Sequence, residues 1–266
     1  MSLLFPEKLR IHLAPGIVVL ARTKQAAVLQ SDAKAVAASD EAGAQPLLDA
    51  LTAMLESFED TPAAASVTLS SRLAPVMMMP WRDDACDPQA QALLAASRFA
   101  KSYGGAAADW DCIAADSGFG RPWITAGIRQ DLVSGLKSVL SGARVQSIAP
   151  LAVALFNAQC ASLPVREAAW LLVPEADRLV GWYCEGRVPK ECISLPAPAD
   201  DDEPVEGLLR REAMLRGLPA TAASLYVAAS QVSGPLAARN VQRLLPRWRC
   251  EPGVAAAYPL HWLGGA

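Results

Sequence analysis

The first part of the chain is patterned for strands. Leu9, Ile11 and Leu13 alternate with polar residues, which is the period of a strand that buries one face. A turn at Ala14-Pro15-Gly16 follows, and a second apolar run comes directly after it. The pattern predicts strands at residues 9–13, 17–20 and 26–29, a linker at 31–43, a helix at 46–55 and a strand at 66–69.

In the middle of the chain, the strand and helix periods are interrupted and then resume. Pro75 and Pro80 enclose a run of three methionines that follows neither a strand nor a helix period. We expect an irregular segment there, ending in an acidic loop at residues 83–87. Beyond it the pattern predicts a helix at 89–103, a strand at 110–115 and a short strand or turn at 123–126. A helix whose face carries Ile128, Leu132, Leu136 and Val139 follows, then a strand at 144–148 and a buried helix from Pro150.

The final part of the chain repeats the opening order. The pattern predicts strands at 168–173, 179–184 and 192–195, a helix at 205–216 and a strand at 224–229. Both parts therefore run strand, strand, strand, helix, strand, although their sequences are not similar. This order indicates an α/β fold with two related halves.

Composition narrows the classes of function. The charged fraction is 19% and the formal net charge is −3, so the chain lacks the basic surface that a nucleic-acid partner requires. The six cysteines form no CxxC pair. Cys112, Cys160 and Cys184 lie in apolar stretches, where a thiol packs as a small hydrophobe. The start lacks a signal-peptide pattern and no apolar run is long enough to span a membrane, so we expect a cytoplasmic protein with reduced thiols.

Motifs for catalysis are absent from the sequence. There is no Gly-x-Ser-x-Gly elbow, no P-loop and no His-Glu-x-x-His zinc motif. Of the two histidines, His12 falls on the polar side of a predicted strand and His261 lies beside Trp262. Each is expected to be a surface or hydrogen-bonded residue. We therefore assign no catalytic residue, no metal ligand and no cofactor.

Several scattered segments make the chain similar to a known superfamily. They are residues 9–20, Thr68 to Arg72, Pro80-Trp81, Phe99 with Tyr103-Gly104, and 145–157. With the repeated element order, they resemble the actin-like, Hsp70-like and sugar-kinase ATPases. Within that superfamily the chain looks like the PilM protein of type IV pili and the cytoplasmic domain of the type II secretion protein GspL. The resemblance implies a duplicated ribonuclease-H-like fold with mixed sheets and two lobes, at residues 1–163 and 164–266.

The nucleotide-binding turns of that superfamily are altered in this chain. Active members carry an Asp-x-Gly turn in each opening hairpin, which serves Mg²⁺ and phosphate. Here the first turn contains Pro15, which lacks an N–H, and the second has carboxylates but no glycine. The glycine pair expected beside the adenosine is replaced by Ala228-Ala229-Ser230. The positions at which a nucleotide could still bind are Gly16, Glu175, Asp177, Ser230 and Gly234.

A non-catalytic member of the superfamily would act by binding a partner protein. The resemblance implies a scaffold of a pilus or secretion assembly, with an inner-membrane component as its partner. A strand edge or a groove between lobes would hold a segment of that partner. Met78, Met79 and Trp81 are candidates for the contact surface, since methionine and tryptophan suit adaptable contacts. The same residues could instead fill the core between two elements.

Two other functions stay open. The chain could bind ATP through atypical loops, with Glu175 or Asp177 holding Mg²⁺. It could also be a small-molecule enzyme that uses residues 109–120. There Asp109 and Asp111 flank Trp110, Asp116 ends the predicted strand, and a glycine-containing loop at residues 117–120 follows. A strand edge followed by an ordinary turn would also explain that pattern.

Overall fold

A computed structural model of the chain describes residues 6–25, 27–37, 43–58, 64–85, 87–115, 118–196, 205–219, 223–228 and 241–244. Of these residues, those up to Ala154 form one compact unit and those from Leu155 form the other. The division falls within the helix α4 (Leu151–Gln159). The lobe boundary predicted between residues 163 and 164 stays a prediction.

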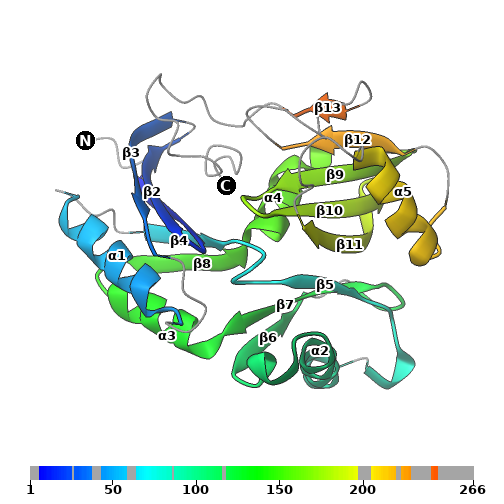
Figure 1. The fold of residues 1–266 in the computed structure, drawn as a ribbon, viewed down its shortest axis with the longest axis horizontal. Helices are drawn as coiled ribbons and strands as arrows, with labels where there is room; N and C mark the ends of the chain where they lie inside the picture. The colour runs from blue at the N-terminus through cyan, green and yellow to red at the C-terminus, as the bar shows by residue number, and fades with distance from the viewer. Residues whose placement is uncertain are drawn as a thin grey trace. The chain divides into compact units, whose positions relative to one another are not determined.

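The first unit is built on a five-stranded mixed sheet (Figure 1). Its strands are β1 (Lys8–Ala14), β2 (Ile17–Lys24), β3 (Ala27–Ala35), β4 (Ala64–Leu69) and β8 (Arg144–Pro150). They lie in the order β3-β2-β1-β4-β8. β1, β2 and β3 pair antiparallel, whereas β4 runs parallel to β1 and β8 parallel to β4. The predicted hairpin and the predicted strand at 66–69 are thus confirmed.

Two helices, α1 (Gln45–Glu56) and α3 (Gln130–Val139), cover one face of this sheet (Figure 1). Pro46 stands in the first turn of α1, where a missing N–H breaks no helical hydrogen bond. Gly135 of α3 allows the two helices to approach, because a Cβ at this position would collide with Leu48. The core between helices and strands is apolar and includes Leu9, Ile11, Leu13, Val18, Leu20, Leu51, Met54, Val67, Leu69, Leu132 and Leu136.

A small three-stranded sheet is inserted in the first unit between β4 and α3 (Figure 1). Its strands are β5 (Val76–Met79), β6 (Trp110–Ala114) and β7 (Trp123–Arg129), in the order β5-β7-β6, all antiparallel. The helix α2 (Pro88–Tyr103) packs on it, flanked by the short 3₁₀ turns η1 (Asp83–Ala85) and η2 (Gly104–Ala107). Asp87 caps α2 by accepting the N–H of Ala90 at 2.8 Å.

The methionine run was predicted to be irregular, and this prediction is wrong. Residues 76–79 form the edge strand β5. The prolines at 75 and 80 flank the strand and do not interrupt it. All four residues of the strand are half-buried or buried, so the run is apolar throughout and does not alternate. The strand gives the inserted sheet its third member.

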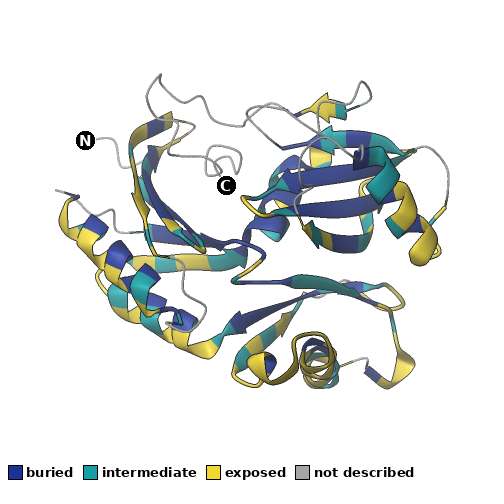
Figure 2. Ribbon diagram, viewed as in Figure 1, coloured by how far each residue is buried: buried dark blue, intermediate teal, exposed yellow. Residues whose placement is uncertain are grey.

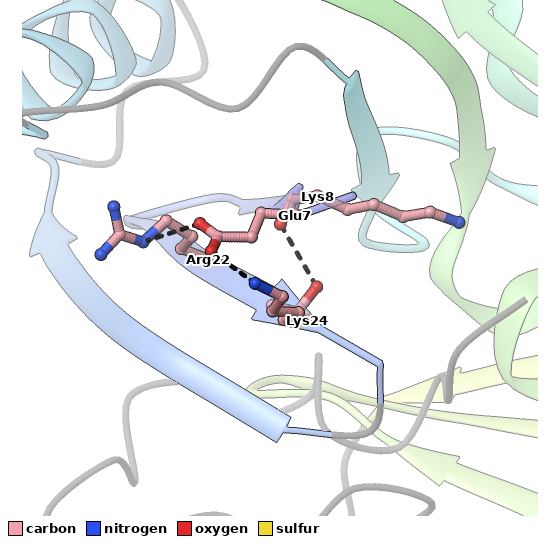
Figure 3. A network of polar contacts seen from close by, with 5 residues as sticks. Glu7, Lys8, Arg22 and Lys24 are labelled. Atoms are coloured by element: carbon pink, nitrogen blue, oxygen red, sulfur yellow. Dashed lines mark hydrogen bonds and ion pairs between the residues drawn. The ribbon is translucent and has the colours of Figure 1, made fainter. Parts of the chain in front are cut away.

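The open end of the first hairpin is held by charged contacts (Figure 3). The carboxylate of Glu7 lies 3.7 Å from Nε of Arg22 and 3.5 Å from Nζ of Lys24. Thr23 donates its hydroxyl to the carbonyl of Lys8 at 3.2 Å, and the Lys8 side chain extends away from this cluster. Partly exposed ion pairs contribute little to stability, so the network orients the two strand ends and adds little to the core.

The second unit is built on another five-stranded sheet (Figure 1). Its strands are β9 (Ala168–Pro174), β10 (Arg178–Glu185), β11 (Val188–Pro196), β12 (Ser224–Val227) and β13 (Val241–Arg243). They lie in the order β11-β10-β9-β12-β13, with β12 parallel to both β9 and β13. The helix α5 (Val205–Leu215) contributes Val205 and Leu209 to a core with Trp170 and Tyr183.

Aromatic side chains from α4 and β10 pack on the opposite side of this sheet. The rings of Phe156 and Trp182 lie 5.1 Å apart. Trp182 and Tyr183 are adjacent in β10, so their side chains point to opposite faces. The 3₁₀ turn η3 (Cys160–Ser162) follows α4 and leads into β9. Both faces of the strand are therefore buried.

The two five-stranded sheets share one topology. In each, three antiparallel strands come first, then a helix, and then a strand that pairs parallel to the first. The spatial orders β3-β2-β1-β4 and β11-β10-β9-β12 correspond strand for strand. The predicted repeat of element order is confirmed, and it extends to the order of strands in space.

Three predicted boundaries are wrong. β3 continues to Ala35, into the expected linker, and β11 begins at Val188, before the expected strand. Both are outer strands. Most residues of β3 are exposed, and the missed residues 188–191 of β11 are exposed or half-buried, so neither stretch has the apolar alternation of a half-buried strand. Ile128 lies in β7 and not in α3. It packs in the same core as Leu132, four residues later, and this spacing is the same as that of a helix face.

Burial follows this layered arrangement. Figure 2 shows buried residues along the central strands and exposed residues on the outer sides of the helices. Among the helices of the described ranges, none has the length and apolarity needed to cross a membrane.

Candidate functional site

A pocket lies beside the turn that joins β1 and β2. The turn residues Pro15 and Gly16 line it, and Gly16 adopts φ +86°, a conformation that favours glycine. The cavity has a volume of about 280 Å³. It lies wholly within the first unit.

Two parts of the first unit form the pocket walls. The five-stranded sheet and its helix contribute apolar side chains from Val36, Pro46 and Leu47. Arg72 and Leu73 come from the segment after β4. The inserted part contributes Trp110 from β6 and Arg129 from the end of β7. The lining is therefore mainly apolar and includes two arginines.

The Arg129 side chain is held in place by Asp131. Nε of Arg129 donates to Oδ1 at 3.0 Å and Nη2 donates to Oδ2 at 2.6 Å, a bidentate arrangement. Burial raises the pKa of Asp131, but the hydrogen bonds from Arg129 and from the N–H of Leu132 outweigh this and hold the pKa below its usual value. Gly43, which also lines the pocket, lies so close that a Cβ there would be 3.1 Å from Nη2 of Arg129.

Trp110 forms a rigid wall because other aromatic rings pack against it. Its ring centroid lies 5.0 Å from that of Tyr103 and 5.7 Å from that of Phe99, both on α2. A Cβ at Gly127 would lie 2.5 Å from the Trp110 ring, so β7 must carry glycine at this position. The wall thus depends on α2, β6 and β7 together.

The residues singled out for nucleotide binding belong to both units of the chain. Gly16 is at the turn of the first hairpin, and Glu175 and Asp177 are at the turn between β9 and β10 in the second unit. The Glu175 N–H donates to the carbonyl of Arg178 at 2.7 Å, so the turn closes on itself. Ser230 and Gly234 lie outside the described residues.

The proposed contact residues of the methionine run differ from one another in burial. Met79 is only 4% exposed and packs with Trp123 and Ala85. Met78 is half-buried. Trp81 is also half-buried, lies 4.8 Å from the ring of Phe119 and donates its Nε1–H to Asp83 at 2.8 Å. Met79 therefore contributes packing, and Met78 and Trp81 retain some surface.

The region from residue 109 to 120 forms the β6–β7 hairpin and its approach. Asp109 and Asp111 are exposed, while Asp116 lies outside the described residues. Phe119 is 84% exposed between Gly118 and Gly120. The side chain of this region that reaches the pocket is Trp110, which lies between the two exposed carboxylates.

His12 is buried, with 5% of its surface exposed. The sequence predicted either a surface residue or a hydrogen-bonded residue, and the second prediction is correct. Nδ1 lies 3.3 Å from the Thr68 hydroxyl, which itself donates to the carbonyl of Ile11 at 3.1 Å. The hydroxyl has one proton and gives it to Ile11, so Nδ1 of His12 carries the proton that Thr68 accepts. Burial lowers the pKa of His12 to about 4, against a smaller raising effect from a hydrogen bond with the Thr68 backbone. His261 lies outside the described residues.

The thiols are only partly as predicted. Cys184 is buried, which raises its pKa to about 12, as expected of a thiol that packs as a hydrophobe. Cys112 and Cys160 are half-buried and not fully enclosed. All three are free cysteines.

Comparison with known proteins rests on structure alone, because no family model and no curated protein matches the sequence. A protein of unknown function with an actin-like ATPase fold from Bacteroides thetaiotaomicron gives a TM-score of 0.58 at 12% identity, over 85% of this chain and 83% of that one. The cytoplasmic domain of EpsL, an inner-membrane component of the type II secretion system of Vibrio cholerae, gives 0.56 at 12% identity, over 97% of this chain and 92% of that one. At this identity the likeness establishes the fold.

Proposed function

The chain has an actin-like, duplicated ribonuclease-H-like fold, and from that premise we propose that it is a non-catalytic scaffold that binds a short segment of a partner protein. The observation that carries this proposal is the mainly apolar pocket beside the first hairpin turn, whose lining includes Arg72 and Arg129. The partner would be an inner-membrane component of a secretion or pilus assembly, and the scaffold would act on the cytoplasmic side. The likeness in fold to the EpsL cytoplasmic domain supports this choice of assembly.

The size and lining of the pocket suit a peptide. About 280 Å³ lies at the lower end of ligand cavities and accommodates one or two side chains. Leu47 and Leu73 would contact an apolar side chain, and Trp110 with Pro46 would lie along an extended backbone. Arg129 gives Nε and Nη2 to Asp131, so an acidic peptide residue beside the apolar one would be met by its remaining N–H groups, with Arg72 in the same lining.

The same turn is poorly suited to a triphosphate. Phosphate loops bind through consecutive backbone N–H groups, and Pro15 removes one of them. The segment Ala14-Pro15-Gly16 also offers no carboxylate to hold Mg²⁺. These features support binding without ATP hydrolysis.

Synthetic peptides test the proposal directly. Peptides that cover the cytoplasmic segments of inner-membrane assembly proteins from the source organism would be titrated into the full chain by calorimetry. We expect one acidic-apolar segment to bind, and Arg129→Ala to weaken it about ten-fold, the loss expected for one charged hydrogen bond. Arg98→Ala, an exposed position on α2 that does not line the pocket, is the matched control. Equal affinity of the Arg129→Ala and Arg98→Ala variants would exclude the pocket as the binding site.

A further inference from the structure

β3 is an outer strand of the first sheet, and among the described residues it pairs with β2 alone. Of its 9 residues, all except Val28 and Ser31 are exposed (Figure 2). An outer strand presents backbone N–H and C=O groups to which another strand can pair. Its length is sufficient for a regular ladder.

The hydrogen bonds around β3 establish which residues face outward. Val36 donates its N–H to the carbonyl of Gly16 at 2.9 Å, so residue 36 faces β2. Ala33 donates its N–H to the carboxylate of Asp32 at 2.8 Å and not to a carbonyl of β2. Since the direction alternates along a strand, Ser31, Ala33 and Ala35 turn their backbone groups to the open edge.

Asp32 and Lys34 flank Ala33, so a two-fold axis at Ala33 places opposite charges across from each other in an antiparallel pair of β3 strands. An antiparallel copy centred there places Asp32 opposite Lys34 of the second copy, and Lys34 opposite its Asp32. These are non-hydrogen-bonded positions, at which side chains of opposite strands lie closest. An axis at Ser31 would place Asp32 opposite Gln30, and an axis at Ala35 would place Lys34 opposite Val36. Only the register centred on Ala33 pairs opposite charges in both directions.

We propose that a second copy of this chain pairs antiparallel along β3, with the two-fold axis at Ala33. The Ala33 N–H then exchanges its bond to Asp32 for the carbonyl of Ala33 in the second copy, and Asp32 is released to meet Lys34. The five-stranded sheet becomes continuous across the dimer. β3 leads directly into Val36 and Ala37, which line the pocket, so the paired edge ends beside the proposed peptide site.

Sedimentation velocity of the full chain over a range of concentrations tests the proposal. The wild type is expected to form dimers as concentration rises. Lys34→Glu places like charges opposite each other twice and should weaken dimerisation about ten-fold. The double variant Asp32→Lys with Lys34→Asp restores the opposite charges and should return dimerisation to the wild-type range.

A second pair of variants probes the backbone. Ala33→Pro removes the N–H at the axis, a group that does not bond to β2, so the fold should persist while the dimer is lost. Ala33→Ser keeps the N–H and is the control. A wild type that stays monomeric at every concentration would overturn the proposal, as would a dimer that withstands both Ala33→Pro and Lys34→Glu. Because no variant alters a pocket residue, peptide binding can fail or succeed independently of this result.

Discussion

At the scale of single residues, His12 gives the fold a dependence on pH. Its pKa is about 4 in the folded chain and about 6.5 in an unfolded one. The unfolded chain therefore binds a proton between these values that the folded chain does not. The stability contribution of neutral His12 is complete above pH 6.5 and is lost as the pH falls toward 4.

We expect the free energy of unfolding to fall by about 2 kcal/mol from this group between pH 7 and pH 5. Urea unfolding at the two pH values measures the change. His12→Asn keeps a side-chain N–H that can reach Thr68 but does not titrate, so its stability should vary less with pH. If the wild type and His12→Asn lose the same free energy, His12 is not the group responsible.

At the scale of elements, the inserted sheet depends on the close approach of β7 to Trp110. Gly127→Ala places a methyl group against an indole ring that Phe99 and Tyr103 prevent from moving freely. We expect a loss of about 1–3 kcal/mol in the free energy of unfolding, the range for overpacking a core. Thermal or urea unfolding measures it, and peptide affinity should fall as well because Trp110 lines the pocket.

Gly142→Ala is the matched control for this substitution. A Cβ at Gly142 meets nothing within 4 Å, so stability should stay close to that of the wild type. Equal stability of both variants would show that Trp110 can move aside, and the pocket wall would then be less rigid than its packing indicates.

The elements that sequence patterns predict well are those with one apolar face. β1 alternates because Leu9, Ile11 and Leu13 lie in the core under α1 and α3, while Arg10 and His12, also buried, lie on the other face. β3 was misjudged because most of its residues are exposed, and the start of β11 because its residues are exposed or half-buried. β5 was misjudged because its four apolar residues are consecutive and all half-buried or buried, so they show no alternation. The alternation of apolar and polar residues indicates which face of a strand lies in the apolar core, and a strand without such a difference between its faces is not detected by it.

The pocket could be predicted only in part. Gly16 was identified as a turn residue with freedom of conformation, and it does line the pocket. Trp110 and Arg129 were missed, because strand pairing brings them there from segments distant in the chain. In the 109–120 region the two aspartates suggested chemistry, whereas the tryptophan between them reaches the cavity.

At the scale of the whole molecule, a duplicated fold with altered turns should not respond to nucleotide. A ligand present at 100 times its Kd raises the free energy of unfolding by about 2.7 kcal/mol. We expect no change in Tm when Mg-ATP is added at millimolar concentration, measured by differential scanning fluorimetry with a known actin-like ATPase as the positive control. A reproducible rise in Tm that requires Mg²⁺ would favour an ATP-binding function and contradict the scaffold proposal.

The two five-stranded sheets also differ in how many residues must be synthesised before all their strands are present. All pairings of the first five-stranded sheet join residues between Lys8 and Pro150. The second sheet gains its last strand, β13, only at residues 241–243. During synthesis on the ribosome, the first sheet can close while the second is still being translated. The first sheet would then be folded before β13 has been made. β12 gains β13 by parallel pairing, which forms more slowly than local antiparallel pairing.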